Sequence, residues 1–175
     1  MAELTTQDRL QPSLLDRLTD NDARNSKESL DARVLSRQQL RAAVLRDLSW
    51  LFNTTRSEPE PHSQNLAGLA KWRGMAHARQ SVINFGLPTF AGETLSSLNT
   101  DRIEKGVRDA IVAFEPRIDP TTLEVELTSD SVGHNNCMRL IIRGKMWNQP
   151  VPLELLLAAD VDVETGNASV RDMRA

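Results

Sequence analysis

One pair of side chains in the sequence could do acid–base or ion-pair chemistry, and it flanks a proline. Glu115, Pro116 and Arg117 follow one another, so a carboxylate and a guanidinium are held at a stiff bend rather than on a helix face. A glutamate can be the general acid of a glycosidase, which uses two carboxylates and keeps one of them protonated near neutral pH. A neighbouring cation favours the ionised carboxylate, which is the wrong form for an acid, and no second carboxylate stands out as a mate. The sequence therefore favours a structural ion pair or a contact with a partner protein over catalysis.

Other reactive side chains do not form a recognisable site. His134 and Cys137 are spaced like metal ligands, but two residues do not fill a coordination shell, and His62 and His77 are isolated in the sequence. Cys137 lies in an apolar strand pattern, where thiols are usually inert, although a Cys–His pair stays open. The sequence contains no glycine-rich phosphate loop and no nucleophile elbow. We therefore expect no metal, no cofactor and no enzymatic activity.

Composition narrows the classes of partner. The chain has 175 residues, which favours one domain or one domain with a tail, and its single cysteine fits a reducing compartment. Its net charge is −3. The charge lacks the basic excess of a typical nucleic-acid binder. No apolar run is long enough to cross a bilayer, and the first residues do not resemble a secretory signal. We expect a cytoplasmic protein that neither inserts into a membrane nor binds nucleic acid.

The helix that carries the Glu115 bend is predicted over residues 100–114. Its apolar residues recur at helical spacing and form one buried stripe: Ile103, Val107, Ala110, Ile111 and Phe114. Pro116 pushes the preceding residue out of helical dihedral angles, so the helix should end near Phe114.

An earlier helix is predicted to begin after Ser36, which forms a capping box with Gln39. Its buried stripe consists of Leu40, Val44, Leu48 and Leu51. Asp47 falls inside the stripe, where a carboxylate is costly unless it is paired. Asp47 either sits in water at the edge of the stripe or forms a structural ion pair with an arginine just beyond the helix, such as Arg56.

Weaker patterns surround these two helices. Leu14, Leu15 and Leu18 are spaced for a short helix that needs something to dock on, followed by a polar linker. Residues 53–68 are predicted to be a loop, and residues 75–84 a short helix with Val82 and Ile83 facing inward.

The period changes from helical to two after Arg117. Apolar and polar residues alternate near 123–128, 138–143 and 151–157, and a last short strand is expected at 169–171. The predicted fold class is α+β, with N-terminal helices and a central amphipathic helix packed on a small antiparallel sheet of three to four strands. Such a sheet leaves an edge that can accept a strand from another chain.

Four segments, taken together, resemble a known family. Residues 12–18 (PSLLDRL), 47–56 (DLSWLFNTTR), 81–88 (SVINFGLP) and 114–117 (FEPR) occur in the order found in the GPW or phage-lysozyme-like baseplate wedge family. Within it they are similar to the TssE proteins of type VI secretion systems. The family tends to have an arginine where this chain has Thr55, and the proline-rich segment that follows also departs from its pattern.

The resemblance implies a structural baseplate subunit of a contractile injection machine. It implies an N-terminal extension over residues 1–33 and a lysozyme-like α+β wedge domain over residues 34–175. The implied partners are the wedge proteins TssF, TssG and TssK, with Glu115, Pro116 and Arg117 as the contact, and the sheath proteins TssB and TssC, joined by strand addition. Leu14, Leu15 and Leu18 are further candidates for a partner contact. A peptidoglycan glycosidase that uses Glu115 as its acid is the alternative.

Overall fold

The computed structural model describes residues 13–19, 24, 35–61, 64–89, 100–128, 137–146 and 152–174. The helical elements are α1 (Leu14–Leu18), α2 (Arg37–Phe52), α3 (Leu66–Arg73), α4 (Ala76–Arg79), the 3-10 helix η3 (Val82–Asn84) and α5 (Thr100–Phe114). The strands are β1 (Glu124–Thr128), β2 (Cys137–Met146), β3 (Leu153–Asp162) and β4 (Ala168–Asp172). The helices precede the strands along the chain, as the sequence patterns predict.

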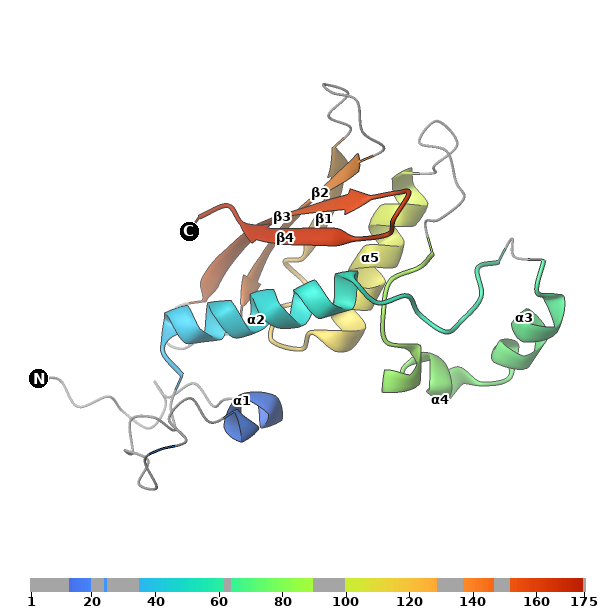
Figure 1. Cartoon of the computed structure of the whole chain (residues 1–175), viewed down its shortest axis with the longest axis horizontal. Coiled ribbons are helices and arrows are strands. Elements are labelled where there is room, and N and C mark those ends of the chain that lie inside the picture. Colours follow the sequence, from blue (N-terminus) through green and yellow to red (C-terminus); the bar gives the residue numbers. More distant parts are fainter. Residues whose placement is uncertain are drawn as a thin grey trace, which may run out of the picture.

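The strands form one antiparallel sheet in the order β1-β2-β3-β4, so each strand pairs with its neighbour in sequence. Helices α2 and α5 pack against one face of this sheet, and α3 and α4 project away from it (Figure 1). The predicted α+β class with a small antiparallel sheet is confirmed. In the parts of the chain that the structure describes, no helix is both long and apolar enough to span a bilayer.

The core lies between the two long helices and the sheet. It is built from the predicted stripes of α2 and α5 and from alternate residues of β2 and β3, such as Leu140 and Leu157. Leu48 and Ile111 are fully buried, one on each helix. Burying a leucine or isoleucine side chain stabilises a fold by roughly 1.5 to 3 kcal/mol, so this layer holds both helices on the sheet.

Both predicted helix boundaries are confirmed. The Ser36 hydroxyl accepts a hydrogen bond from the Gln39 backbone N–H (3.2 Å), and the Gln39 side chain accepts one from the Ser36 N–H (2.8 Å). Helix α5 stops at Phe114, two residues before Pro116. The corner that carries the charged pair is therefore placed by a proline, as expected.

The segment between α2 and α5 differs from its prediction. The expected loop at 53–68 already contains the start of α3, and the expected helix at 75–84 is divided into α4 and η3. Val82 and Ile83 are 81% and 65% exposed, so their predicted inward orientation is wrong. The Ser81 hydroxyl caps the Ile83 N–H (3.3 Å) and starts a new turn there, which directs Asn84 inward instead.

The predicted strand patterns hold in the described residues, with shifted boundaries. Met138, Leu140 and Ile142 are buried on β2, while β3 runs to Asp162, five residues beyond the predicted strand. The predicted start of that strand at Val151 lies outside the described residues. So does most of the polar linker predicted after α1.

Candidate functional site

The chain turns sharply at the end of α5. The Glu115 N–H still donates to the Ile111 carbonyl (2.8 Å), and the Ile118 N–H then donates to the Glu115 carbonyl (3.2 Å). This turn places Glu115 inside the molecule at 2% exposure, leaves Pro116 exposed and brings the Arg117 side chain back over the bend.

Glu115 and Arg117 form a two-pronged ion pair. Arg117 Nε lies 2.6 Å from Glu115 Oε1, and Arg117 Nη2 lies 2.5 Å from Glu115 Oε2. The Arg117 backbone N–H also donates to Oε1 (3.2 Å). The expected structural ion pair is thus present, and it corrects the picture of two charges displayed side by side, because the carboxylate is buried beneath the guanidinium. Paired hydrogen bonds of this kind are among the stronger polar contacts in proteins.

Asp47 joins the same pair from α2. Arg117 Nη2 also lies 2.5 Å from Asp47 Oδ2, and Arg46 Nε donates to Asp47 Oδ1 (2.8 Å). The expected ion pair between Asp47 and Arg56 is wrong. Arg56 lies past the end of α2, where its backbone N–H bonds to the Leu87 carbonyl, and its side chain pairs with Glu60 (2.8 Å).

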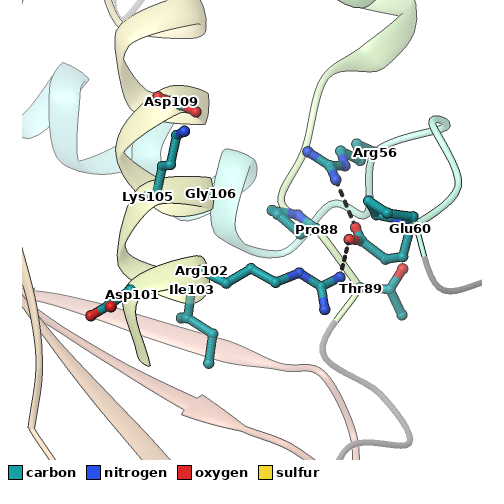
Figure 2. A pocket seen from close by; sticks show the side chains of 11 residues that line it. Arg56, Glu60, Pro88, Thr89, Asp101, Arg102, Ile103, Lys105, Gly106 and Asp109 are labelled. Atoms are coloured by element: carbon teal, nitrogen blue, oxygen red, sulfur yellow. Dashed lines mark hydrogen bonds and ion pairs between the residues drawn. The ribbon is translucent and has the colours of Figure 1, made fainter. Parts of the chain in front are cut away.

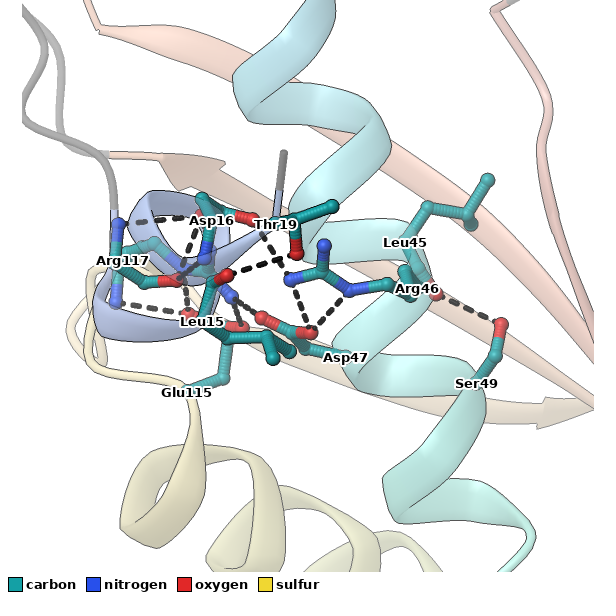
Figure 3. Close-up of polar contacts among 10 residues, drawn as sticks. Leu15, Asp16, Thr19, Leu45, Arg46, Asp47, Ser49, Glu115 and Arg117 are labelled. Atoms are coloured by element: carbon teal, nitrogen blue, oxygen red, sulfur yellow. Dashed lines mark hydrogen bonds and ion pairs between the residues drawn. The ribbon is translucent and has the colours of Figure 1, made fainter. Parts of the chain in front are cut away.

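Helix α1 docks on this cluster through one carboxylate. Asp16 lies 2.9 Å from Arg46 Nη2 and 4.0 Å from Arg117 Nη1, and the Ser13 hydroxyl donates to it (2.6 Å) (Figure 3). We call these five charged residues (Asp16, Arg46, Asp47, Glu115 and Arg117) the corner network. It joins α1, α2 and the bend after α5, which are far apart in the sequence.

The network favours the charged forms of Arg117 and Asp16. Burial opposes ionisation of Arg117, but the hydrogen bonds that Arg117 donates to Glu115 and Asp47 outweigh burial and raise the pKa of Arg117 above its ordinary value. Burial likewise acts to raise the pKa of Asp16, but hydrogen bonds from Ser13 and Arg46 bring that pKa below its ordinary value. Acidic and basic groups alternate through the network, so each buried charge has an opposite neighbour.

Two of the three leucines of α1 are largely uncovered. Leu14 and Leu18 are each 73% exposed, whereas Leu15 is 40% exposed and lines a small cavity of about 240 Å³ with Trp50 and Phe114. Polar contacts thus hold α1 on its own chain while most of its apolar surface stays uncovered. The expected partner contact through these leucines stays a prediction.

Two members of the network were not anticipated from the sequence. Asp16 follows Ser13 at the spacing of a capping box, which both side chains form. Arg46 stands four residues before Trp50, and its guanidinium lies 5.3 Å from the centre of the indole ring. Those spacings were visible, but they report local contacts and do not show that the two residues meet across the fold.

In the corner, Glu115 acts as a hydrogen-bond acceptor. Both of its carboxylate oxygens accept hydrogen bonds from Arg117, and a second carboxylate, on Asp47, shares the same guanidinium. A general acid must instead present a proton to its substrate. In the described residues no group of three or more histidine, cysteine, aspartate or glutamate side chains could hold a metal ion. His77 and Cys137 are exposed, while His62 and His134 fall outside those residues.

A larger pocket of about 440 Å³ lies beside the first turns of α5 (Figure 2). Within it, Glu60 bridges Arg56 (2.8 Å) and Arg102 (2.6 Å). Gly106 lets α5 pass close to Pro88, since an added Cβ would come within 2.9 Å of the proline ring. The pocket thus lies at the junction between α5 and the segment after α2, and the Glu60 carboxylate in it is already held by two guanidinium groups.

The sequence matches one known protein family. Residues 38–151, more than half of the chain, match the family described as Baseplate wedge protein gp25. The matched region begins at the second residue of α2 and includes Asp47 and the Glu115–Arg117 corner. No curated protein and no solved structure gives a significant match. The chain belongs to the family of the baseplate wedge protein gp25, which includes the TssE proteins of type VI secretion systems.

Proposed function

We propose that the protein is a non-enzymatic structural subunit of a type VI secretion baseplate, where it binds wedge proteins in the cytoplasm and starts sheath assembly by strand addition. The observation that carries the proposal is the family match over residues 38–151. The type VI assignment rests on the resemblance of residues 12–18, 47–56, 81–88 and 114–117 to the TssE proteins.

The wedge contact combines the corner with α1. Pro116 is exposed, the Arg117 side chain is 21% exposed, and Leu14 and Leu18 are largely uncovered. Glu115, at 2% exposure, shapes this surface rather than touching a partner. The wedge proteins TssF, TssG and TssK are the proposed partners of this surface.

Sheath strands require an open sheet edge, and β1 does not offer one. Long side chains of α5 take up one peptide group of β1 and one of the residue before it. The Leu127 N–H donates to Glu104 Oε1 (2.8 Å), and the Leu123 carbonyl accepts from Arg108 Nε (3.4 Å). Side chains in these positions stand where a fifth strand would lie.

The opposite edge, on β4, is more open. Ala168, Val170 and Asp172 turn their peptide groups away from β3, because the intervening residues form the ladder hydrogen bonds. Asn53 occupies both groups of Ala168 (2.8 and 2.9 Å). No hydrogen bond within the described parts of the chain takes up those of Val170 and Asp172. We infer that β4 is the strand to which TssB and TssC add.

A matched pair of proline substitutions tests the edge. Val170 and Val125 are both partly buried, and both turn their N–H groups outward from the sheet. Val170→Pro removes a donor from the proposed accepting edge, whereas Val125→Pro removes one from the covered edge. We expect Val170→Pro to weaken binding of purified TssB–TssC about two- to tenfold, the value of one hydrogen bond, and Val125→Pro to leave it unchanged.

The wedge contact is tested separately. Leu14→Ser with Leu18→Ser should reduce co-purification with TssF, TssG and TssK without lowering the melting temperature, since both side chains are already exposed. Met173→Ser, another exposed apolar side chain, is the control. Undiminished co-purification would show that α1 is not part of the contact.

The glycosidase alternative is tested by a cell-wall degradation assay. Activity that is abolished by Glu115→Gln would favour the glycosidase over the structural role.

A further inference from the structure

The chain makes a closed excursion between α2 and α5, which we call the arm (residues 57–85). Its two ends meet where the Arg56 N–H donates to the Leu87 carbonyl (2.9 Å) and the Leu87 N–H donates to the Thr54 carbonyl (2.8 Å). Gly86 makes this closure possible: its φ is +129°, and a Cβ there would lie 2.5 Å from the Thr54 oxygen. The arm carries α3, α4 and η3 and extends away from the sheet and the long helices (Figure 1).

The base of the arm is held by buried polar contacts. Asn84 is 6% exposed; its Oδ1 accepts from the Glu58 N–H (2.9 Å), and its Nδ2 donates to the Arg79 carbonyl (3.2 Å). The Arg79 guanidinium also pairs with the Glu58 carboxylate (2.7 Å). These contacts tie the outgoing and returning chains together, so the arm leaves the body in a defined direction.

Beyond its base the arm buries none of its apolar side chains fully. Neither α3 nor α4 has a buried residue. Leu66, Val82 and Ile83 are 74%, 81% and 65% exposed, and Met75 is 40% exposed. Helices this short are marginal in water unless an apolar face is packed against something. A rigid base that presents uncovered apolar side chains is typical of a docking element.

The arm is acidic at its base and basic beyond it. Glu58 and Glu60 lie at the base, whereas residues 64–85 contain no aspartate or glutamate and include the basic Lys71, Arg73 and Arg79. Arg79 is neutralised by Glu58, but Lys71 and Arg73 have no ion pair within the described part of the chain. The whole chain carries a net charge of −3, so the outer part of the arm (residues 64–85) is a local positive region on an acidic protein. A complementary surface would be acidic with apolar side chains among its carboxylates.

We propose that the arm docks on an acidic, partly apolar face of a neighbouring wedge protein, as a second contact separate from the corner. The inference rests on the proposed baseplate function and adds a partner surface to it. A lipid surface or a nucleic acid suits the arm less well, because sites for anionic lipids use clusters of roughly four to eight lysines or arginines. Counting only the residues that the structure describes, the arm has two cations without an ion pair and four exposed apolar side chains, which is the balance of a protein interface.

The test measures binding of the full chain to a purified complex of TssF, TssG and TssK. Val82→Ser with Ile83→Ser removes the two most exposed neighbouring apolar side chains, and Lys71→Glu with Arg73→Glu reverses the unpaired charges. Each double variant should weaken binding about tenfold or more, the effect of losing a central interface contact. Lys71→Arg with Arg73→Lys keeps the charge and should bind like the parent protein.

Matched controls lie outside the arm. Lys105→Glu with Lys145→Glu reverses two other exposed lysines, and Met173→Ser removes another exposed apolar side chain; both should leave wedge binding unchanged. Raising sodium chloride from about 50 mM to about 500 mM should weaken wedge binding by the parent protein more than wedge binding by the Lys71→Glu, Arg73→Glu variant. Salt screens the attraction of the two basic side chains, and this variant no longer has them.

The outcomes separate the two proposals. If the parent does not bind the wedge complex, the baseplate function fails and the arm contact fails with it. If the parent binds and both arm variants bind within about twofold of it, only the arm inference is overturned, since such a change is below that of one hydrogen bond. Arm variants that lose binding to phosphatidylserine vesicles but keep wedge binding would also overturn it. Should the Val82–Ile83 variant unfold, the charge variant decides alone.

Discussion

Replacing Arg117 by methionine should destabilise the protein more than any other change of a single charge in the corner network. The substitution removes the guanidinium that covers Glu115 and leaves a carboxylate at 2% exposure without its counter-ion. Breaking a buried ion pair by deleting one partner costs about 3 to 5 kcal/mol. The side chains of Arg117 and Asp47 are 21% and 26% exposed, so water offsets part of the loss and we expect the lower end, about 3 kcal/mol.

The assay is thermal and urea unfolding followed by circular dichroism. For a chain of this size, a loss of about 3 kcal/mol lowers the melting temperature by roughly 6 to 12 °C. Arg143→Met is the matched control: Arg143 also pairs with a glutamate, Glu126, but those side chains are 51% and 58% exposed. Exposed pairs contribute about 0 to 1 kcal/mol, so this control should melt close to the parent.

A second substitution tests the cause. If the loss comes from an uncompensated buried charge, then Glu115→Gln combined with Arg117→Met should be more stable than Arg117→Met alone, since the charge has been removed with its partner. An Arg117→Met protein that melts within the range of the Arg143→Met control would refute the reasoning. So would a double variant that is no more stable than the single one.

Three further predictions concern other parts of the fold. The pKa of Asp16 in the folded chain lies below its ordinary value, because hydrogen bonds from Ser13 and Arg46 outweigh burial. The contribution of Asp16 to the docking of α1 is therefore complete above the ordinary pKa and is lost as the pH falls through the lowered folded value, which amide chemical shifts of α1 measured on acidification will show. Gly86→Ala should lower the free energy of unfolding by at least about 3 kcal/mol and Gly166→Ala by only about 1 kcal/mol. Both glycines have a positive φ, but only the Cβ added at Gly86 would collide with backbone atoms. Equal losses in urea unfolding would contradict this reasoning. Leu48→Ala should cost about 3 kcal/mol by the same measurement, since Leu48 is fully buried, and a smaller loss would mean that the site collapses around the cavity.

Sequence patterns were sufficient where a local rule decides the structure. The alternation on β2, the capping box at Ser36 and the stop before Pro116 each depend on a few consecutive residues. The Glu115–Arg117 ion pair was also within reach, because two opposite charges flanking a proline are already close along the chain.

The patterns were insufficient where two distant segments meet. Asp47 was assigned an arginine near it in sequence, but its partner Arg117 lies 70 residues away and is brought there by packing of α5 against α2. The predicted burial of Val82 and Ile83 is wrong for a related reason. An apolar pair becomes buried only where the fold brings it to a core, and the arm carries this pair away from the sheet and the long helices. Neither effect can be inferred from the local pattern of a single sequence.

The side chain of Asn53 has a consequence for how β4 can be extended. A carboxamide carries the same donor and acceptor as a peptide unit, and here it fills both positions offered by Ala168. The first outward-facing peptide groups of β4, those of Ala168, are therefore already hydrogen-bonded within the chain. An incoming strand would start opposite Val170 and could not shift toward Ala168. The Asn53 side chain would therefore set both the register and the maximum length of the strand pairing.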